Sequence, residues 1–450
     1  MIAHKDCIRK LICYHRACRL TVYPCVHTAS DIAVKPTFFL APTLPWRTAL
    51  RRLLSALLPA VAALAWVLPG PALLGPACSP LLIVGVLLAE SPAGRFLSAL
   101  TYFGIIGSAL PGEVQSFFGS GWMVGIGLWV LSSLILAGPW AWASRGWRVV
   151  VVLLIEAVPP IGFLGWASPL SVAGVLFPGL GVVGFALGLA ILWTLAVLVR
   201  PASIINALTL SMVAPTVLSG ASIWANAAYT PPEPPAGWLG VNTHVGRETD
   251  DVMTEVSRNQ QWIDQAAAVV RAKAKSKAGA KQRFVVVLPE DVAGTWGPGT
   301  AAQVRAAMRP GDVWLVGASV ISNRPHRDGR YLDAVVGLGQ RGDAVLFASP
   351  APVPGGMWKP WNGEKSYTAA RWWEPVQTIA GVRAWSAICY DQGIAWPWLQ
   401  ALAQRPDVVL RVSNFWYEPA GAVAPRVEAA TAAAWARLMS AAVVTAVNRG

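Results

Sequence analysis

Long apolar stretches follow one another through the first half of the chain, between residues 47 and 229. A helix needs about 20 apolar residues to cross the roughly 30 Å hydrocarbon core of a bilayer. Some stretches reach that length with at most one charge, and others are shorter or interrupted by proline. The long stretches are 122–143, 149–166, 172–199 and 203–228, and the shorter ones are 53–68, 71–89 and 96–110. The pattern predicts a membrane domain, residues 47–229, with about seven transmembrane helices.

The pattern changes after Tyr229 and a proline-rich linker, residues 230–235. Short apolar runs then alternate with helical periodicity, which is typical of buried strands separated by helices. The expected strands are 284–288, 313–316, 344–347, 382–388 and 408–412, and the expected helices are 300–308, 394–405 and 423–439. The second half, residues 230–450, is therefore predicted to be an α/β domain built in layers.

Composition agrees with this division. Hydrophobic residues make up 55% of the 450 residues and charged residues only 13%, about half the roughly 25% charged content of soluble domains. A single soluble globule is therefore excluded. The net charge is +13, but the excess is scattered apart from one basic run, residues 271–283, which we interpret as a solvated helix face. We expect no direct binding of nucleic acid.

The loops between the apolar stretches predict the orientation in the membrane. Basic and non-basic loops alternate, and the basic ones carry Arg95, Arg145, Arg148 and Arg200. Because short cytoplasmic loops retain Lys and Arg, the N-terminus is predicted to be cytoplasmic and the C-terminal domain periplasmic, in a bacterial inner membrane. Glu156 is the one acid well inside a predicted span. It is either a functional carboxylate or a side chain that reaches the interface.

The first 46 residues form a leader of unclear structure, without periodicity or a signal-peptide layout. Four cysteines lie there at spacings that fit none of the usual zinc patterns, so no metal or other cofactor is expected. Cys78 lies in an apolar segment and is predicted to be a packing residue. Cys389 is the one cysteine of the C-terminal domain, which excludes a disulfide framework and leaves a lone thiol.

Several expected strands end in residues that can carry chemistry. Glu290, Cys389 and Asn414 each follow or end such a strand, and reactive groups gather at strand ends in α/β sheets. A carboxylate beside a thiol can take its proton and return it to a leaving group. Glu290 and Cys389 are therefore a candidate base and nucleophile. The alternative, from spacing alone, is a buried structural cysteine and an exposed glutamate.

Three local sequences favour the catalytic interpretation. Val285-Val-Val-Leu-Pro-Glu290, Ala387-Ile-Cys-Tyr-Asp391 and Val412-Ser-Asn-Phe-Trp416, in this order, resemble motifs of the nitrilase or carbon–nitrogen hydrolase superfamily. The resemblance implies an αββα sandwich with a Glu, Lys, Cys triad that acts on amides or thioesters. Several spans followed by such a domain also resemble the apolipoprotein N-acyltransferases, whose nitrilase domain is periplasmic.

Carried over residue by residue, the resemblance makes Glu290 the general base and Cys389 the nucleophile. Asp391 takes the place of an acid that follows the nucleophile, and it is expected to contact substrate together with Asn414 and Trp416. The triad lysine is absent from its expected position, which the register gives to Ser349, and Met357 stands where the acyltransferases have a glutamate. Lys359 is the candidate replacement for the missing cation.

The sequence departs from the acyltransferases at these positions, and other segments resemble a different branch of the superfamily. Three segments resemble the TraB family of conjugal transfer proteins: Pro352-Val-Pro-Gly-Gly-Met-Trp-Lys-Pro360, Ile388-Cys-Tyr-Asp-Gln392, and Ala434-Trp-Ala-Arg-Leu438 before Ala446-Val-Asn448. This resemblance implies a membrane component of plasmid transfer, with lipids and other envelope or conjugation proteins as partners, whose domain acts on or binds an envelope amide or acyl group. Lipoprotein acylation and a catalytically inactive assembly module remain as alternatives. The C-terminal part of the fold is expected to be abbreviated.

Overall fold

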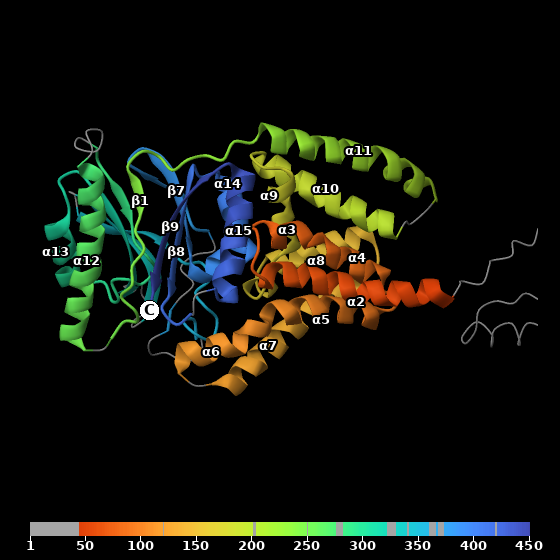
Figure 1. Ribbon diagram of the computed structural model, residues 1–450, viewed down its shortest axis with the longest axis horizontal. Coiled ribbons are helices and arrows are strands. Elements are labelled where there is room, and N and C mark those ends of the chain that lie inside the picture. The colour runs from red at the N-terminus through yellow and green to blue at the C-terminus, as the bar shows by residue number, and fades with distance from the viewer. Residues whose placement is uncertain are drawn as a thin grey trace, which may run out of the picture. The chain divides into compact units, whose positions relative to one another are not determined.

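The computed structural model describes most of the chain from residue 45 onward. The described ranges are 45–119, 121–200, 204–249, 251–275, 282–321, 330–339, 342–359, 366–367, 373–418 and 421–450, with side chains of 204–213 left aside. The leader with its four cysteines and residues 276–281 of the basic run 271–283 lie outside these ranges. Residues 46–450 form one compact unit, in which apolar helices precede two β-sheets (Figure 1).

Four helical segments of the described chain are long and apolar enough to cross a membrane. They are Trp46–Val67, Pro92–Phe118, Trp122–Trp142 and Gly181–Val199. The first contains helix α2 (Pro45–Val67), the second α5 (Pro92–Ile106) and α6 (Leu110–Phe118), the third α7 (Trp122–Ala137), and the last is α10 (Gly181–Val199). The prediction of a multi-span helical membrane part is thereby confirmed at this level.

The other predicted spans have a different local structure. Stretch 71–89 forms two short helices, α3 (Leu74–Cys78) and α4 (Pro80–Leu88). Stretch 149–166 ends its helix α8 (Gly146–Ala157) early, because two prolines follow at 159–160 and proline cannot continue a helix. Stretch 172–199 is divided into α9 (Val172–Leu176) and α10, and stretch 203–228 forms α11 (Ile204–Ala228). The count of about seven spans stays a prediction.

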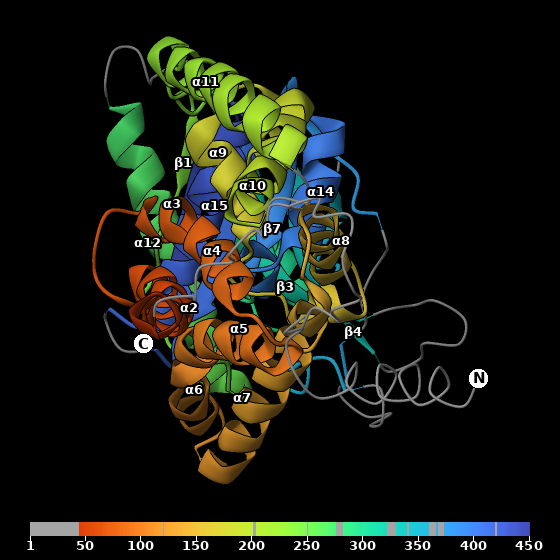
Figure 2. The same ribbon diagram turned by 90° about the vertical axis from the view of Figure 1, so that its right-hand side faces the viewer.

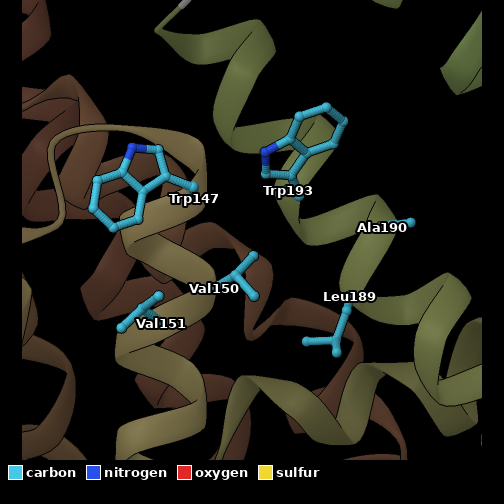
Figure 3. Close-up of a pocket in the computed structure, with 6 residues that line it drawn as sticks. All are labelled: Trp147, Val150, Val151, Leu189, Ala190 and Trp193. Carbon is cyan, nitrogen blue, oxygen red and sulfur yellow. The ribbon is translucent and has the colours of Figure 1, made fainter.

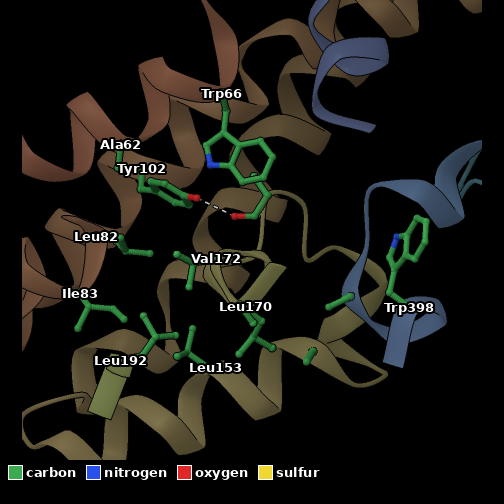
Figure 4. Close-up of a cluster of buried hydrophobic side chains, with 14 of the residues drawn as sticks. Ala62, Trp66, Leu82, Ile83, Tyr102, Leu153, Leu170, Val172, Leu192 and Trp398 are labelled. Carbon is green, nitrogen blue, oxygen red and sulfur yellow. Dashed lines mark hydrogen bonds between the residues drawn. The ribbon is translucent and has the colours of Figure 1, made fainter. Parts of the chain in front are cut away.

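The helices pack around large buried side chains. Trp66, Leu82, Tyr102 and Leu192 from four different helices belong to one buried cluster (Figure 4). The Tyr102 hydroxyl donates a hydrogen bond of 2.6 Å to the carbonyl oxygen of Ala167. This contact satisfies a polar group that would otherwise be costly to bury, and it fixes the irregular segment after α8 against α5.

The first sheet has five strands in the order β1-β2-β3-β4-β5. The strands are β1 (Trp238–Gly240), β2 (Val285–Val287), β3 (Val313–Ile321), β4 (Tyr331–Gly339) and β5 (Gly342–Ala348). β1, β2 and β3 run parallel, whereas β4 and β5 are antiparallel to their neighbours. Helices α12 (Val252–Ala274) and α13 (Pro298–Ala307) bury their apolar sides against this sheet.

The second sheet has four strands in the order β6-β7-β8-β9. They are β6 (Gln377–Ile379), β7 (Val382–Ile388), β8 (Val408–Phe415) and β9 (Ala442–Arg449), and the last three run parallel. The outer face of this sheet shares a core with α14 (Ala395–Gln404), α15 (Val423–Met439) and the apolar helices. In Figure 1, α12 and α13 lie on one side of the strands and α14 and α15 on the other.

The two sheets face each other through a common apolar core. Val285 and Val287 of β2 point into it, while Val286 between them points to α12 and α13, as the alternation of a strand requires. Residues of β7, β8 and β9 complete this core from the second sheet. The layers are therefore helices, sheet, sheet and helices. Every strand and helix expected in this half is present, and β1, β4, β6, β9 and α12 are additional.

The second sheet is joined to the apolar helices by direct contacts. In α9, a Cβ added to Gly174 would lie only 1.8 Å from the carbonyl oxygen of Ala434 in α15, so the two backbones touch. The Tyr390 hydroxyl donates a 2.5 Å hydrogen bond to the carbonyl oxygen of Phe163. Figure 2 shows α15 next to α9 and α3 in a second view. The residues that follow β7 are thus held against the helical part.

Candidate functional site

Three predicted site residues meet where strands of both sheets end. Glu290 follows β2 by three residues, Cys389 follows β7 directly, and Asn414 is the penultimate residue of β8. Glu290 and Cys389 are buried, with 4% and 8% of their surface exposed. The Glu290 carboxyl and the Cys389 thiol are near enough for each to influence the pKa of the other. The Asn414 backbone N–H donates a 2.9 Å hydrogen bond to Glu290 Oε2.

Cys389 has an unusual backbone conformation. Its φ angle is +43°, in the left-handed region, and Asp291 next to Glu290 has a φ of +46°. Non-glycine residues in this region cost about 1–3 kcal/mol and persist where the surrounding structure fixes them, often at functional sites. The turn directs the thiol back between the two sheets, into their common core. The strain is a reason to look for chemistry at this position.

Buried acids dominate the electrostatics around the thiol. Burial, and then the neighbouring Asp333 carboxyl, raise the pKa of Glu290 well above its ordinary value. Burial, and then the Glu290 and Glu428 carboxyls, raise the pKa of the Cys389 thiol. Each acid disfavours the ionised form of the others. Burial and the neighbouring acids therefore favour the uncharged forms of both the thiol and the carboxyl group.

Asp333 belongs to this group, although the sequence analysis did not single it out. It is the third residue of β4 and is 2% exposed, and its carboxyl raises the pKa of Glu290. Burial raises its pKa, and the Asp291 and Asp391 carboxyls raise it further. The signal in the sequence is a single acid inside the apolar run of residues 331–339, since a buried strand rarely carries one without a reason.

Asp391 lies beneath this group, fully buried. Its Oδ1 accepts hydrogen bonds of 3.1 Å from the Ser349 hydroxyl and from the Ala351 backbone N–H. Burial raises the pKa of Asp391 to about 8, although these two hydrogen bonds oppose the shift. Ser349, where the family resemblance expects a lysine, is thus part of a buried polar link. A substrate contact of Asp391 stays a prediction.

Lys359 and Trp416 lie among aromatic rings. The Lys359 ammonium nitrogen is 5.7 Å from the centroid of the Phe118 ring in α6, a cation–π distance. Trp416 stacks with Phe117 and Tyr417, and the Arg247 guanidinium lies 5.0 Å over its ring. The strongest electrostatic neighbours of Cys389 are carboxyls rather than Lys359. The catalytic role of Lys359 and the substrate contact of Trp416 stay predictions.

Two hollows were found outside this group of acids. One, of about 420 Å³, lies between α8 and α10 and is lined by apolar side chains such as Trp147, Val150 and Trp193 (Figure 3). The other, of about 590 Å³, is lined by polar residues of the first sheet and the loop after β1. Within the described residues, no group of three or more His, Cys, Asp or Glu side chains is arranged to hold a metal ion.

Comparison with known proteins decides the family. The chain is 31% identical over 427 residues to the conjugal transfer protein TraB of Agrobacterium fabrum, covering 90% of this chain and 93% of that protein. The chain belongs to the TraB family. A probable conjugal transfer protein TraB of Sinorhizobium fredii is also 31% identical, over 367 residues that cover 79% of this chain and 86% of the relative. No protein-family model matches this TraB family member.

Proposed function

We propose that this TraB family member acts in conjugal plasmid transfer as an inner-membrane protein whose periplasmic domain is a nitrilase-type enzyme for an envelope amide. Family membership supports the conjugal role, because two relatives carry it in their names. The observation that carries the enzymatic part is the meeting of Glu290, Cys389 and the Asn414 N–H in one buried site. The order of layers, helices, sheet, sheet and helices, supports the αββα sandwich of the nitrilases.

The geometry supports a two-step acyl transfer. In the first step, the Cys389 sulfur bonds to the carbonyl carbon of an amide while the thiol proton passes to the ionised form of Glu290. The C–N bond then breaks, the amine leaves with the proton from Glu290, and a thioester on Cys389 remains. In the second step, Glu290 takes a proton from water or an acceptor amine, which attacks the thioester. The sulfur leaves and recovers the proton.

The surroundings of the pair predict slow turnover. Only the ionised form of Glu290 can act as a base, and its raised pKa makes that form less populated. The raised pKa of Cys389 likewise makes the thiolate harder to form. The Asn414 N–H favours the carboxylate, since a hydrogen bond to the charged form lowers a pKa. A cation would favour it more strongly. We propose that Lys359 reaches the site when substrate is bound, by leaving the ring of Phe118.

Conjugation frequency tests this function directly. Deleting the gene from its replicon should lower the frequency, and the wild-type gene supplied in trans should restore it. We expect Cys389→Ala to behave like the deletion and Glu290→Gln to restore transfer at most weakly, because each removes one partner of the proton transfer. Cys78→Ala is the matched control, since this thiol lies in α3 and is half-buried. Full restoration by Cys389→Ala would show an inactive module instead.

A further inference from the structure

A polar pocket lies near Asp291, the residue that follows Glu290. The hollow of about 590 Å³ is lined by Arg247, Glu248, Thr249, Thr295, Ser319, Tyr331 and Tyr367. Five of these seven side chains carry a hydroxyl group, and none is aliphatic. Its volume is that of a site for a small molecule. Such a lining matches a ligand that forms hydrogen bonds, and it does not match an acyl chain.

The pocket borders the site from the side of the first sheet. The Ser319 hydroxyl donates a 2.7 Å hydrogen bond to Asp291 Oδ1 and lies 2.5 Å from the Tyr367 hydroxyl. Ser319 and Asp333 are paired neighbours across β3 and β4, so their side chains share the same face of the sheet. The Asp333 carboxyl in turn raises the pKa of Glu290, and Asp291 is the next residue along the chain from Glu290. One wall of the pocket is therefore only one residue away from the proposed base.

The pocket also borders the site from the side of the thiol. Arg247 lies over the ring of Trp416, and Trp416 packs against Tyr417. Burial raises the pKa of the Tyr417 phenol most, and the charge of Cys389 is the next largest cause of the increase. Contacts thus lead from one side of the pocket to Asp291, next to Glu290, and from the other side to Tyr417, whose pKa Cys389 influences.

The side chain of Asn448 connects Glu290 with the pocket loop, residues 243–249, which follows β1 and lines the pocket. Asn448 in β9 is fully buried. Its Oδ1 accepts hydrogen bonds from the Thr243 hydroxyl at 2.8 Å and the Val245 N–H at 3.1 Å. Its Nδ2 donates 2.8 Å hydrogen bonds to the Gly246 carbonyl, next to Arg247, and to Asn414 Oδ1. Residue 414 then donates its own N–H to Glu290.

We propose that this pocket is the substrate pocket of the Cys389–Glu290 site, that it takes a small hydrophilic amide, and that Asn448 is the positioning residue that holds the pocket loop and the base in register. The proposal rests on the proposed function, and it names the substrate class of the same site. Asn448 touches no reacting atom, and its effect on Glu290 passes through Asn414. Both ends of its amide are used, so a carboxylate in its place loses two donated hydrogen bonds.

Alkylation of Cys389 tests the pocket without any known substrate. Iodoacetamide is a small hydrophilic amide, and N-dodecyl iodoacetamide carries the same reactive group on an apolar chain. The full-length protein in detergent is treated with each reagent, and peptide mass spectrometry gives the rates at Cys389 and at Cys78. In the wild type, we expect iodoacetamide to react faster at Cys389 than the dodecyl reagent does. Thr295→Trp and Thr249→Trp fill the pocket and should each slow iodoacetamide at Cys389 at least tenfold, with the Cys78 rate unchanged.

The pH profile of the same reaction tests Asn448. Asn448→Asp should move the midpoint of Cys389 alkylation by iodoacetamide upward by on the order of one pH unit, because the new carboxylate adds a negative charge to the buried acids around the thiol. Asn242→Asp is the matched control, since Asn242 is exposed and accepts one hydrogen bond from the Val447 N–H. An unchanged Cys78 rate shows that a variant is folded.

Three results would overturn the proposal. They are an unchanged iodoacetamide rate in both pocket-filling variants, equal or faster reaction of the dodecyl reagent in the wild type, and an unmoved pH midpoint in Asn448→Asp. None of them depends on conjugation. Failure of the proposed function would appear separately, as normal transfer by Cys389→Ala in cells while the alkylation pattern still holds.

Discussion

At Cys389, burial and charge act against the reactivity that a nucleophile needs. The thiol shares its surroundings with the carboxyls of Glu290, Asp333 and Glu428, and each of them disfavours a thiolate. A cation within about 4–6 Å shifts a carboxyl pKa downward by about 1–3 units. The side chain of Ser349 supplies no cation, because its hydroxyl is uncharged and donates a hydrogen bond to Asp391. The identity of residue 349 therefore sets how reactive the thiol is at neutral pH.

Ser349→Lys should make Cys389 more reactive at lower pH. A lysine ammonium at this position would lie among Asp333, Asp391 and Glu290, and would stabilise the ionised forms of both Glu290 and the thiol. We expect the midpoint of the pH profile for alkylation by iodoacetamide to fall by about 1–3 units. The measurement is the rate of Cys389 modification between pH 5 and pH 10.

Ser349→Met separates charge from size in this experiment. Methionine has a chain of similar length to lysine without the charge, so it should leave the midpoint at the wild-type value or raise it through further desolvation. The idea of a missing cation fails if Ser349→Lys and Ser349→Met give the same profile. It also fails if the lysine moves the midpoint upward.

Some site residues could be predicted from the sequence and others could not. Glu290, Cys389 and Asn414 end apolar runs, and the ends of parallel strands meet in space, so their meeting follows from local patterns. Asp333 comes from an antiparallel strand and reaches the same point only because β4 pairs with β3 in one register. Asn448 was visible only as part of a family motif. Its four hydrogen bonds depend on the crossing of three chain segments far apart in sequence.

At the scale of elements, the contact between α9 and α15 joins the apolar helices to the second sheet. Gly174 permits the two backbones to touch, and Gly188 of α10 packs on Ala173, where an added Cβ would lie 2.6 Å from the Ala173 Cβ. Burial of α15 against α9 and α3 keeps the helix beside η5 (Cys389–Gln392), which begins with the proposed nucleophile. The membrane part therefore helps to hold the residues of the site in place.

Gly174→Ala should weaken this contact. The new Cβ would lie 1.8 Å from the Ala434 carbonyl oxygen, so one helix has to move. Overpacking of this kind costs about 1–3 kcal/mol. We expect a lower midpoint of thermal unfolding in detergent, together with faster proteolysis between the apolar helices and the sheets.

Gly104→Ala in α5 is the matched control, because an added Cβ there meets no atom within 4 Å. Alanine favours a helix over glycine by about 1 kcal/mol, so this variant should unfold at the wild-type temperature or slightly above it. Equal melting of the two variants would argue against a tight contact between α9 and α15.

The elements themselves were predictable where one physical signal dominated. The runs at 382–388 and 408–412 are apolar on both faces, because each lies between the sheet core and a helical layer, and such runs stand out in a sequence. β1 and β6 have only three residues each and offer too little pattern. β9 alternates between buried and half-buried positions and follows α15 closely. The turn before it, at Ser440 with a φ of +55°, is not marked by a glycine.

At the scale of the whole molecule, the basic residues in the loops and the number of spanning helices must agree on one membrane topology. Four described segments can span a membrane, while the alternation of basic loops was derived from about seven. A reporter that is active only in the periplasm, such as alkaline phosphatase, distinguishes the possibilities. We expect a fusion after Pro235 to be active and a fusion after Arg148 to be inactive. A reporter active only in the cytoplasm is the control and should give the opposite pattern. An inactive fusion after Pro235 would remove the periplasmic site from the proposal.

The protein is not expected to replace a lipoprotein acyltransferase in a living cell. A lipoprotein acyltransferase has to admit a diacylglyceryl chain and to stabilise an oxyanion at a rate that sustains growth. Here Ser349 stands at the position that the nitrilase resemblance gives to the lysine, and the proposed substrate pocket is lined mostly by side chains with hydroxyl groups. Loss of one oxyanion donor costs on the order of 10² to 10³ in rate. We therefore expect this protein not to rescue a strain depleted of its lipoprotein acyltransferase, measured as colony formation, even when membrane fractions show that it accumulates.

Ser349→Lys alone should not rescue the strain either, because the polar pocket would still exclude the acyl chain. Rescue by the wild type, abolished by Cys389→Ala, would instead assign lipoprotein acylation to this chain.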